Sequence, residues 1–288
     1  MEDIEKILGD NNIVSDETSL NVLNQHFIID KDLLQRIVDA SHVTSQDVVL
    51  EIGAGIGNLT DNIASRARFV YSIELDSKFK PILDKLAEKH SNLMMIYGNA
   101  LKIEWPKFNK IVSAIPYNIA EPLLLNLIGK EFESCTLVVS KHFADLITSE
   151  NESRLSVIVP AFFKVSLLEV IPASLFYPVP RYDSALICIR PIDHERLVQN
   201  PIKYLIGEIF KRRYSKVKNA LRDAMIVWTA KIKGKILTKR KSKEFISYLH
   251  LEQTILEKPV NNLSGEDFRF LADSLGKRVD GIYSYCEQ

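Results

Sequence analysis

The sequence predicts an α/β protein, with a mostly parallel sheet that carries helices on both faces, followed by a smaller helical domain. Short apolar runs, each long enough for one strand, alternate with stretches of helical spacing from residue 48 to about residue 140. This alternation is expected when crossover helices join parallel strands. A glycine-rich turn directly follows the first of these runs. From about Pro191 the strand-like runs give way to helical spacing, which predicts the second domain.

The composition is that of a globular protein with a sizeable core. Of the 288 residues, 46% are hydrophobic and 26% are charged, and the formal net charge is zero. We expect an acidic leader at residues 1–20, a first domain at residues 21–192 and the helical domain at residues 193–288. The amino terminus is acidic and no apolar run follows it, so we expect neither a signal peptide nor a membrane-spanning helix.

The three cysteines are far apart in the sequence, odd in number and not at metal-ligand spacing. They are Cys135, Cys188 and Cys286. This usage is typical of a reducing, cytoplasmic compartment. It predicts no disulfide framework and no metal site.

The elements of the first domain follow in chain order. Asp30 is expected to cap a helix whose apolar face includes Leu33, Leu34, Ile37 and Val38. A strand at residues 48–50 precedes the glycine turn, and a helix at residues 59–67 follows it. Further strands are expected at residues 69–74, 93–97, 110–113 and 137–139, with a helix at residues 81–89 and a continued apolar pattern at residues 156–163.

The second domain shows helical spacing throughout. Helices are expected at residues 205–210, 217–228, 245–249 and 264–275. Ser264 stands where a helix cap is expected, and Asp267 occupies the position at which a capping box prefers glutamate.

The glycine turn indicates a ligand. Gly53, Gly55 and Gly57 alternate after the strand, where they allow positive φ and leave no Cβ to block a ligand against the backbone. A dinucleotide-binding loop would place Gly or Ala at position 58, but this chain has Asn58. The spacing, with Glu51 at the strand end, instead resembles the first motif of S-adenosylmethionine-dependent methyltransferases. The alternative is a structural turn that binds no ligand.

Glu74 lies at the end of the second strand, about twenty residues beyond the glycine turn. In nucleotide-binding α/β folds a carboxylate at this place accepts hydrogen bonds from both ribose hydroxyls. A capping or solvent-exposed role is the alternative. Gly53, Glu74, Asn99 and Ala114 all fall at the carboxyl ends of predicted strands, where ligands of such sheets bind.

The turn Ile115-Pro116-Tyr117 follows a predicted strand. An aromatic ring on a turn stiffened by proline, beside a methyl-donor pocket, could stack on a flipped base. At this point the chain resembles the small-subunit rRNA adenine dimethyltransferases, the KsgA-type family that also includes the erythromycin-resistance methylases. The matching segments, in this order, are residues 25–27, 51–60, 73–76, 98–102, 115–119, 154–157, 176–184 and 210–221.

The resemblance implies a Rossmann-like class I methyltransferase domain with a small C-terminal helical domain. It also implies methyl transfer from S-adenosylmethionine to the exocyclic amino group of adenines in small-subunit rRNA. Tyr117 and Phe176 would then sandwich the base beside Ile115 and Pro116. The residues implied to line the cofactor pocket are His26, Ile28, Gly53, Gly55, Glu74, Leu75, Asn99, Ala100 and Ala114.

Two positions depart from the family pattern at the expected site. Ala114 stands where the family has the asparagine that accepts amino hydrogens of the adenine, and Asn99 replaces an aspartate that contacts the cofactor. Loss of such an acceptor costs roughly a hundred- to a thousand-fold in rate. One hypothesis is therefore an active rRNA adenine dimethyltransferase that lacks this group. The alternative hypotheses are a catalytically weakened paralogue that binds small-subunit RNA or assists ribosome assembly, and a methyltransferase with another substrate.

Positive charge is concentrated in one part of the chain. Between Lys203 and Glu244 there are fourteen basic residues and three acidic ones, so the rest of the chain is acidic by the same margin. Such asymmetry indicates a surface that binds a polyanion, although a solvated helix face is the alternative. The predicted partner is small-subunit rRNA or a pre-30S-type particle, bound by a monomer that contacts no membrane. The residues expected to bind RNA are Lys211, Arg212, Arg213, Lys216, Lys218 and Arg222.

Overall fold

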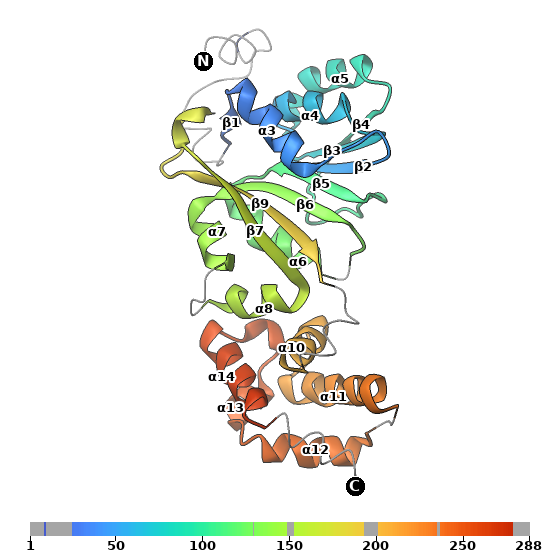
Figure 1. Cartoon of the computed structure of the whole chain (residues 1–288), viewed down its shortest axis with the longest axis vertical. Helices are drawn as coiled ribbons and strands as arrows, with labels where there is room; N and C mark the ends of the chain where they lie inside the picture. The colour runs from blue at the N-terminus through green and yellow to red at the C-terminus, as the bar shows by residue number, and fades with distance from the viewer. Residues whose placement is uncertain are drawn as a thin grey trace. The chain divides into compact units, whose positions relative to one another are not determined.

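The computed structural model describes residues 25–128, 130–148, 153–192, 201–234 and 237–278, together with Gly9. They form two compact units (Figure 1): a sheet unit within Met1–Asp145 and Val165–Arg190, and a helical unit within Leu146–Lys164 and Pro191–Gln288. This division differs from the expected domain limits in two places, because residues 146–164 and 191–192 group with the helical unit. The leader expected at residues 1–20 lies outside the described residues, apart from Gly9.

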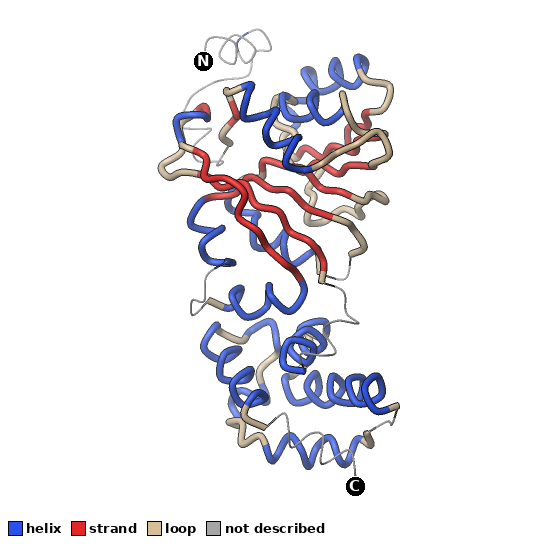
Figure 2. Tube along the Cα trace, in the orientation of Figure 1, coloured by secondary structure: helices blue, strands red, loops and turns tan. Residues whose placement is uncertain are grey.

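The sheet unit is built on a seven-stranded twisted sheet, drawn in red in Figure 2. Its spatial order is β4-β3-β2-β5-β6-β9-β7. The five strands from β4 to β6 in this order run parallel to one another, and β9 runs antiparallel to β6. The predicted α/β class with a mostly parallel sheet is therefore confirmed. The strands are β2 (Val48–Ile52), β3 (Phe69–Glu74), β4 (Leu93–Tyr97), β5 (Lys110–Ala114), β6 (Ser134–Ser140), β7 (Phe163–Ile171) and β9 (Ser184–Pro191).

Strand order reverses between β2 and β5. The chain adds β3 and β4 on one side of β2 and then crosses to add β5 and β6 on the other. The β2–β5 ladder joins Val49 to Lys110 and Leu50 to Ile111. Beyond it, the N–H of Ile52 donates to a side chain, the Ser113 Oγ, at 2.8 Å. Ligands of open α/β sheets bind outside the carboxyl ends of the strands at such a reversal.

Polar contacts hold the amino ends of the same two strands together. Asp47 precedes β2 and is 5% exposed, and its carboxylate accepts hydrogen bonds from the Lys110 Nζ at 3.0 Å and the Asn109 Nδ2 at 2.6 Å. Asn109 in turn accepts the N–H of Val48 at 2.7 Å. A buried ion pair is favourable only when its remaining polar groups are satisfied, as these are. The opening between β2 and β5 is therefore confined to their carboxyl ends.

Helices cover the sheet on both faces. Figure 1 shows α3 (Lys31–Ser41), α4 (Asn58–Ala64) and α5 (Lys80–Lys89) on one side and α6 (Ala120–Asn126) on the other. Asp30 caps α3 as predicted, since its Oδ1 accepts the N–H of Leu33 at 2.6 Å. The apolar face expected for this helix is buried in the core. The helix expected at residues 59–67 is shorter, because α4 ends at Ala64.

A small second sheet closes over the carboxyl edge of the large one. β1 (Phe27–Ile28) pairs antiparallel with β8 (Phe176–Tyr177), although the two segments are far apart in the sequence. The Nδ2 of Asn58, the first residue of α4, donates to the carbonyl of Ile28. The segment that contains residues 25–28 is thus fixed to the glycine turn. Short 3-10 helices lie at Ser77–Phe79, Tyr117–Ile119, Ala173–Leu175 and Val260–Asn262.

The helical unit has an aromatic core that includes Trp228, Phe210, Phe245 and Phe268. The capping box expected at Ser264 is present, because its side chain accepts the N–H of Asp267 and the Asp267 carboxylate accepts the N–H of Ser264. Along the described part of the chain, no helix is long and apolar enough to cross a membrane. The remaining helices are α7 (Lys141–Thr148), α8 (Arg154–Phe162), α10 (Pro201–Lys211), α11 (Val217–Lys233), α12 (Lys239–Tyr248), α13 (Gln253–Glu257) and α14 (Gly265–Gly276).

Candidate active site

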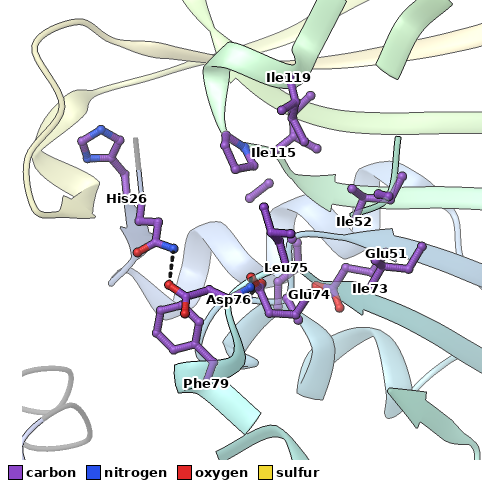
Figure 3. Close-up of a pocket in the computed structure, with 18 of the residues that line it drawn as sticks. His26, Glu51, Ile52, Ile73, Glu74, Leu75, Asp76, Phe79, Ile115 and Ile119 are labelled. Atoms are coloured by element: carbon purple, nitrogen blue, oxygen red, sulfur yellow. Dashed lines mark hydrogen bonds between the residues drawn. The ribbon is translucent and has the colours of Figure 1, made fainter. Parts of the chain in front are cut away.

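A cavity of about 560 Å³ lies at the carboxyl ends of the strands. Figure 3 shows its labelled residues converging from β2, from β3 and the segment after it, from the segment after β5 and from the segment before β1. Every residue that the sequence analysis assigns to the catalytic or cofactor site lines this one cavity. They are His26, Ile28, Gly53, Gly55, Glu74, Leu75, Asn99, Ala100, Ala114, Ile115, Pro116, Tyr117 and Phe176.

The glycine turn needs glycine for two separate reasons. Gly53 and Gly55 have φ values of +85° and +56°, a region that other residues rarely adopt. A Cβ on Gly55 would also lie 3.0 Å from the Phe27 ring, and one on Gly53 would lie 3.3 Å from the Pro116 Cδ. The turn can therefore pack closely against β1 on one side and the 115–117 turn on the other. At this turn the floor of the cavity is therefore formed by backbone atoms without side chains.

The Glu74 carboxylate points into this floor. Its Oε2 accepts the N–H of Gly55 and its Oε1 accepts the N–H of Asp76, each at 2.8 Å. Burial raises the pKa of Glu74, although these two N–H groups oppose the shift. Each carboxylate oxygen can accept a further hydrogen bond. The side chain thus fixes the glycine turn and still offers acceptor sites to a ligand.

Glu51 is a second carboxyl group in the cavity wall, and it is 1% exposed. Its Oε2 accepts hydrogen bonds from the Thr60 Oγ1 and the Ser72 Oγ, both at 2.6 Å. Burial raises its pKa to about 7, against the opposing effect of these hydroxyl groups. A cationic ligand in the cavity would favour the ionised form.

A third acid, Asp76, belongs to a polar network at the cavity mouth. The Gln25 Nε2 donates to its carboxylate at 3.2 Å, and the Lys78 Nζ forms a salt bridge with it at 2.9 Å. The same ammonium group donates to the Gln25 Oε1 at 2.9 Å. This network joins the segment before β1 to the loop after β3.

Tyr117 is held between two segments. Its hydroxyl lies 2.6 Å from the Ser184 Oγ, and its ring stacks on His26 with centroids 5.8 Å apart and planes at 27°. The His26 Nδ1 lies 2.8 Å from the carbonyl of Pro178, so that nitrogen carries the proton and donates. Burial lowers the pKa of His26, which keeps the ring neutral at pH 7. One face of the tyrosine ring is therefore covered by imidazole.

Phe176 is more enclosed than expected for a residue that stacks on a base. It lines the cavity but is 2% exposed, and it packs in the core cluster with Ile28 and Ile171. Its pairing with Ile28 in the β1–β8 ladder accounts for this burial. An exposed aromatic face for a base is thus more readily supplied by Tyr117, after displacement of His26.

The two departures from the family pattern both face the cavity. Asn99 closes a local turn, because its Oδ1 accepts the N–H of Leu101 at 2.9 Å, and one lone pair of that oxygen remains. Ala114 ends β5 with only a methyl group toward the cavity, so it offers no side-chain acceptor. The polar side chains that line the cavity are thus three carboxyl groups and several amides, those of Gln25, Asn58, Asn99 and Asn118 among them.

The charge of the lining restricts the ligand. Three acids line the cavity, and none of its described lining residues is lysine or arginine. A dinucleotide would bring a pyrophosphate close to these acids, whereas the nearby Lys78 ammonium is already paired with Asp76. A ligand that carries positive charge and a ribose fits better. Glu51, Asp76, Gln25, Asn58 and Ser184 belong to this arrangement but are absent from the predicted site, although all five lie in segments that match the family.

The basic residues predicted to bind RNA lie in the helical unit, at the end of α10 and the start of α11. Three acids reduce their charge, and one of them is Asp223, which pairs with Arg222 at 2.8 Å. Glu208 is bridged by Lys211 at 2.7 Å and Arg212 at 2.8 Å, and Glu257 is bridged by Lys216 and Lys218. Hydrogen bonds from these two lysines lower the pKa of Glu257 to about 2. Glu257 lies outside the segment from which the charge excess was counted, so that count does not include this acid.

Arg213 differs from its neighbours. Its guanidinium lies 5.3 Å from the ring centroid of Tyr214 and 5.9 Å from that of Phe210. Tyr214 is 80% exposed. A cation beside an exposed aromatic ring is a common composition for a surface that binds nucleic acid.

Comparisons with known proteins agree with this geometry. The family model described as "Ribosomal RNA adenine dimethylase" matches residues 19–254. A probable ribosomal RNA small subunit methyltransferase A of Pyrococcus abyssi is 38% identical over 208 residues, which are 70% of this chain and 75% of the relative. A protein of the same description from Methanosarcina barkeri is 34% identical over 258 residues, which are 88% of this chain and 86% of the relative.

Solved structures show the same fold. A dimethyladenosine transferase from Plasmodium falciparum matches with a TM-score of 0.59 and 26% identity, covering 88% of this chain and 98% of the other. The 23S rRNA methyltransferase ErmE matches with a TM-score of 0.56 and 23% identity, covering 87% and 99%. The fold is thus the Rossmann-like methyltransferase fold that the sequence predicts.

Proposed function

We propose, because this chain belongs to the ribosomal RNA adenine dimethylase family, that it transfers methyl groups from S-adenosylmethionine to the exocyclic amino group of adenines in small-subunit rRNA. The cavity carries this proposal, since it brings together the glycine turn, Glu74 and the 115–117 turn at one sheet edge. The family match and the relatives described as small subunit methyltransferases support the substrate.

The residues present suit the cofactor. S-adenosylmethionine has a ribose, an ammonium group and a sulfonium, and when bound it supplies an electrophilic methyl group. Glu74 would accept the ribose hydroxyl groups, and Gly53 and Gly55 would let the amino acid part lie against the backbone. Leu75, which is 68% exposed, and Ala100 would cover the adenine. Glu51 would lie on the side of the positive charges.

The target amino nitrogen is a poor nucleophile because its lone pair is delocalised into the ring. Two acceptors for its hydrogens would orient the lone pair toward the methyl group and stabilise the positive charge that develops. In this chain the main-chain carbonyl of Ile115 would serve as one acceptor, and the side chain at position 114 supplies none. Tyr117 would stack on the base after His26 has moved aside.

RNA binding would fall to the helical unit. Arg213 and the paired residues Lys211, Arg212, Lys216, Lys218 and Arg222 would contact phosphates. We propose that the bound particle is a small subunit or a pre-30S-type precursor, and that the protein acts as a monomer.

The direct test is transfer of labelled methyl groups to purified small subunits that lack the dimethylated adenines. Label in the rRNA at adenine amino groups is the expected result. Ala114 favours a second candidate, a relative that binds small subunits with little catalysis. Tight binding without label would support that candidate and overturn the proposed activity.

Glu74→Gln is expected to weaken S-adenosylmethionine binding by roughly 10- to 100-fold, because one charged acceptor of the ribose is lost. The amide oxygen can still accept one of the two backbone N–H groups, so the glycine turn stays in place. Isothermal titration calorimetry measures the effect. Glu88→Gln, on the exposed face of α5, is the matched control. Equal affinities in both variants would contradict the ribose role.

Arg213→Gln is expected to lower the slope of log binding constant against log salt concentration by about one. Arg213 is a cleaner choice than Arg212, whose removal would leave the 7%-exposed Glu208 with fewer partners. A filter-binding series with small subunits measures the slope. Arg36→Gln in the sheet unit, where Arg36 pairs with Glu169, is the control and should leave the slope unchanged. Equal slopes in all three proteins would rule out a phosphate contact at Arg213.

A further inference from the structure

The loop at residues 178–184 projects apolar side chains into solvent beside the cavity. Tyr182 is 72% exposed and Val179 is 59% exposed, which places both among the most exposed large hydrophobic residues described. Arg181, between them, is also exposed, whereas Pro178 and Pro180 are buried. The catalytic and cofactor roles assigned above use none of the three exposed side chains.

Both ends of the loop are fixed to residues of the cavity wall. At one end the carbonyl of Pro178 accepts the His26 Nδ1–H at 2.8 Å, and at the other the Ser184 Oγ bonds the Tyr117 hydroxyl at 2.6 Å. Asp183 adds two contacts, because its carbonyl accepts the N–H of Lys141 and its Oδ1 accepts the N–H of Ala173, both at 2.9 Å. Figure 3 shows the pale yellow loop next to His26. The loop is therefore a fixed part of the rim.

The distance from Tyr182 to the site follows from chain geometry. Tyr182 is two residues from Ser184, so their Cα atoms lie within about 7 Å of each other. The Ser184 side chain contacts Tyr117, which lines the cavity. The backbone of Tyr182 thus lies close to the part of the cavity wall that Tyr117 forms.

An enzyme that acts on a base must take it out of the stack, and the neighbouring base then loses a stacking partner. An aromatic side chain can replace that partner, and each such stack is typically strong enough to detect by alanine substitution. A cation next to the ring suits the phosphate of the same strand.

We propose that Tyr182 and Arg181 form a second nucleotide subsite at the rim of the cavity. The Tyr182 ring stacks on the unpaired base next to the target adenine, and the Arg181 guanidinium contacts a phosphate of that strand. The subsite rests on the proposed function, since its ligand is the rRNA strand that enters the cavity.

The test compares Tyr182→Ala and Tyr182→Phe with wild type on small subunits that lack the dimethylated adenines. Tyr182→Ala should weaken subunit binding roughly 5- to 100-fold, as expected for a lost base–aromatic stack. It should also remove chemical protection of the base beside the target adenine. Tyr182→Phe keeps an aromatic ring, so it should retain the subunit binding and the base protection of the wild-type protein. S-adenosylmethionine affinity should stay the same in all variants, because Tyr182 does not line the cavity.

Met94→Ala provides the matched control. Met94 is 50% exposed and lies in β4, close to the amino end of the strand and so away from the cavity. The Met94→Ala variant should leave subunit binding and chemical protection of the neighbouring base unchanged. Arg181→Gln should lower the salt slope of subunit binding by about one.

Three outcomes would overturn the subsite. Equal binding and protection in wild type and Tyr182→Ala would exclude stacking while leaving the proposed function intact. Weaker binding of Tyr182→Ala with unchanged protection of the rRNA would assign the loop to a ribosomal protein. A wild-type protein that binds no small subunits would overturn both the subsite and the proposed function.

Discussion

Ala114→Asn is expected to raise the rate of methyl transfer to small subunits on the order of a hundred- to a thousand-fold. This is the usual effect on the rate of one preorganised polar group that stabilises a transition state. The asparagine oxygen would add the second acceptor for the target amino group, beside the main-chain carbonyl of Ile115. Ala114 lines the cavity at the end of β5 and also packs against the core cluster, so the longer side chain must reach the cavity past these apolar neighbours. Single-turnover transfer of labelled methyl groups measures the rate.

Ala114→Leu separates this effect from a change in cavity shape. Leucine is similar in size to asparagine but accepts no hydrogen bond. It should give no gain, or a loss if the cavity is too small, while S-adenosylmethionine affinity reports whether the cavity is intact. If Ala114→Asn binds the cofactor normally and still shows no gain, the acceptor is not what limits this site.

The strands around the cavity were predictable because their pattern is local. The apolar runs of β2, β3, β5 and β6 form largely buried strands, and the glycine turn directly follows the first of them, whereas β4 is a more exposed edge strand. Residues 154–171 were harder to predict, because an almost continuous apolar run there is compatible with either a helix or a strand. In the structure this segment is helix α8 followed by edge strand β7. Periodicity alone does not distinguish a buried helix from a strand in such a run.

The long-range features of the site had no local pattern. β1 and β8 are two residues each, and their pairing joins segments about 150 residues apart. The burial of Phe176 follows from that pairing, so a sequence motif could place Phe176 at the site without revealing that its ring is enclosed. Asn58 looks like a departure from a dinucleotide loop, yet its amide donates to the carbonyl of Ile28. Its contribution is to hold β1 over the glycine turn.

The predicted RNA-binding surface shows a similar limit. Charge counting along a segment treats each lysine and arginine as free, but partners can come from elsewhere in the chain. Glu257 pairs with Lys216 and Lys218 across 41 and 39 residues. The sequence does not distinguish Arg213 from these two lysines. In the structure its guanidinium lies over aromatic rings instead of beside an acid from elsewhere in the chain. The choice of Arg213 for the salt test therefore depends on tertiary contacts.

Glu51→Gln is expected to change how stability depends on pH. Burial raises the pKa of Glu51 from 4.5 to about 7, so the folded state binds this proton more tightly than the unfolded chain. Stability from this group is fully present below pH 4.5 and is lost as pH rises through about 7. A shift of this size corresponds to roughly 3 kcal/mol of unfolding free energy. Glutamine has no such proton to lose, so the variant should lack this loss.

The substitution is well suited to the site. Both hydroxyl donors, from Thr60 and Ser72, bond the same carboxylate oxygen, and an amide oxygen can accept both. Urea unfolding at intervals from pH 5 to pH 8.5 measures the difference between variant and wild type. The variant should gain relative stability as pH rises, by up to roughly 3 kcal/mol. Glu88→Gln, at an exposed position, should show a constant difference. A constant difference for Glu51→Gln as well would show that this carboxyl group titrates normally.

Saturating S-adenosylmethionine should reduce the same pH dependence in the wild-type protein. A positive charge near the Glu51 carboxylate favours its ionised form, which opposes the effect of burial and brings the folded-state pKa closer to that of the unfolded chain. Glu51→Gln should show no corresponding change in slope when the cofactor is added. If the cofactor stabilises both proteins by the same amount at every pH, its positive groups lie away from Glu51, and the acidic wall there serves the fold alone.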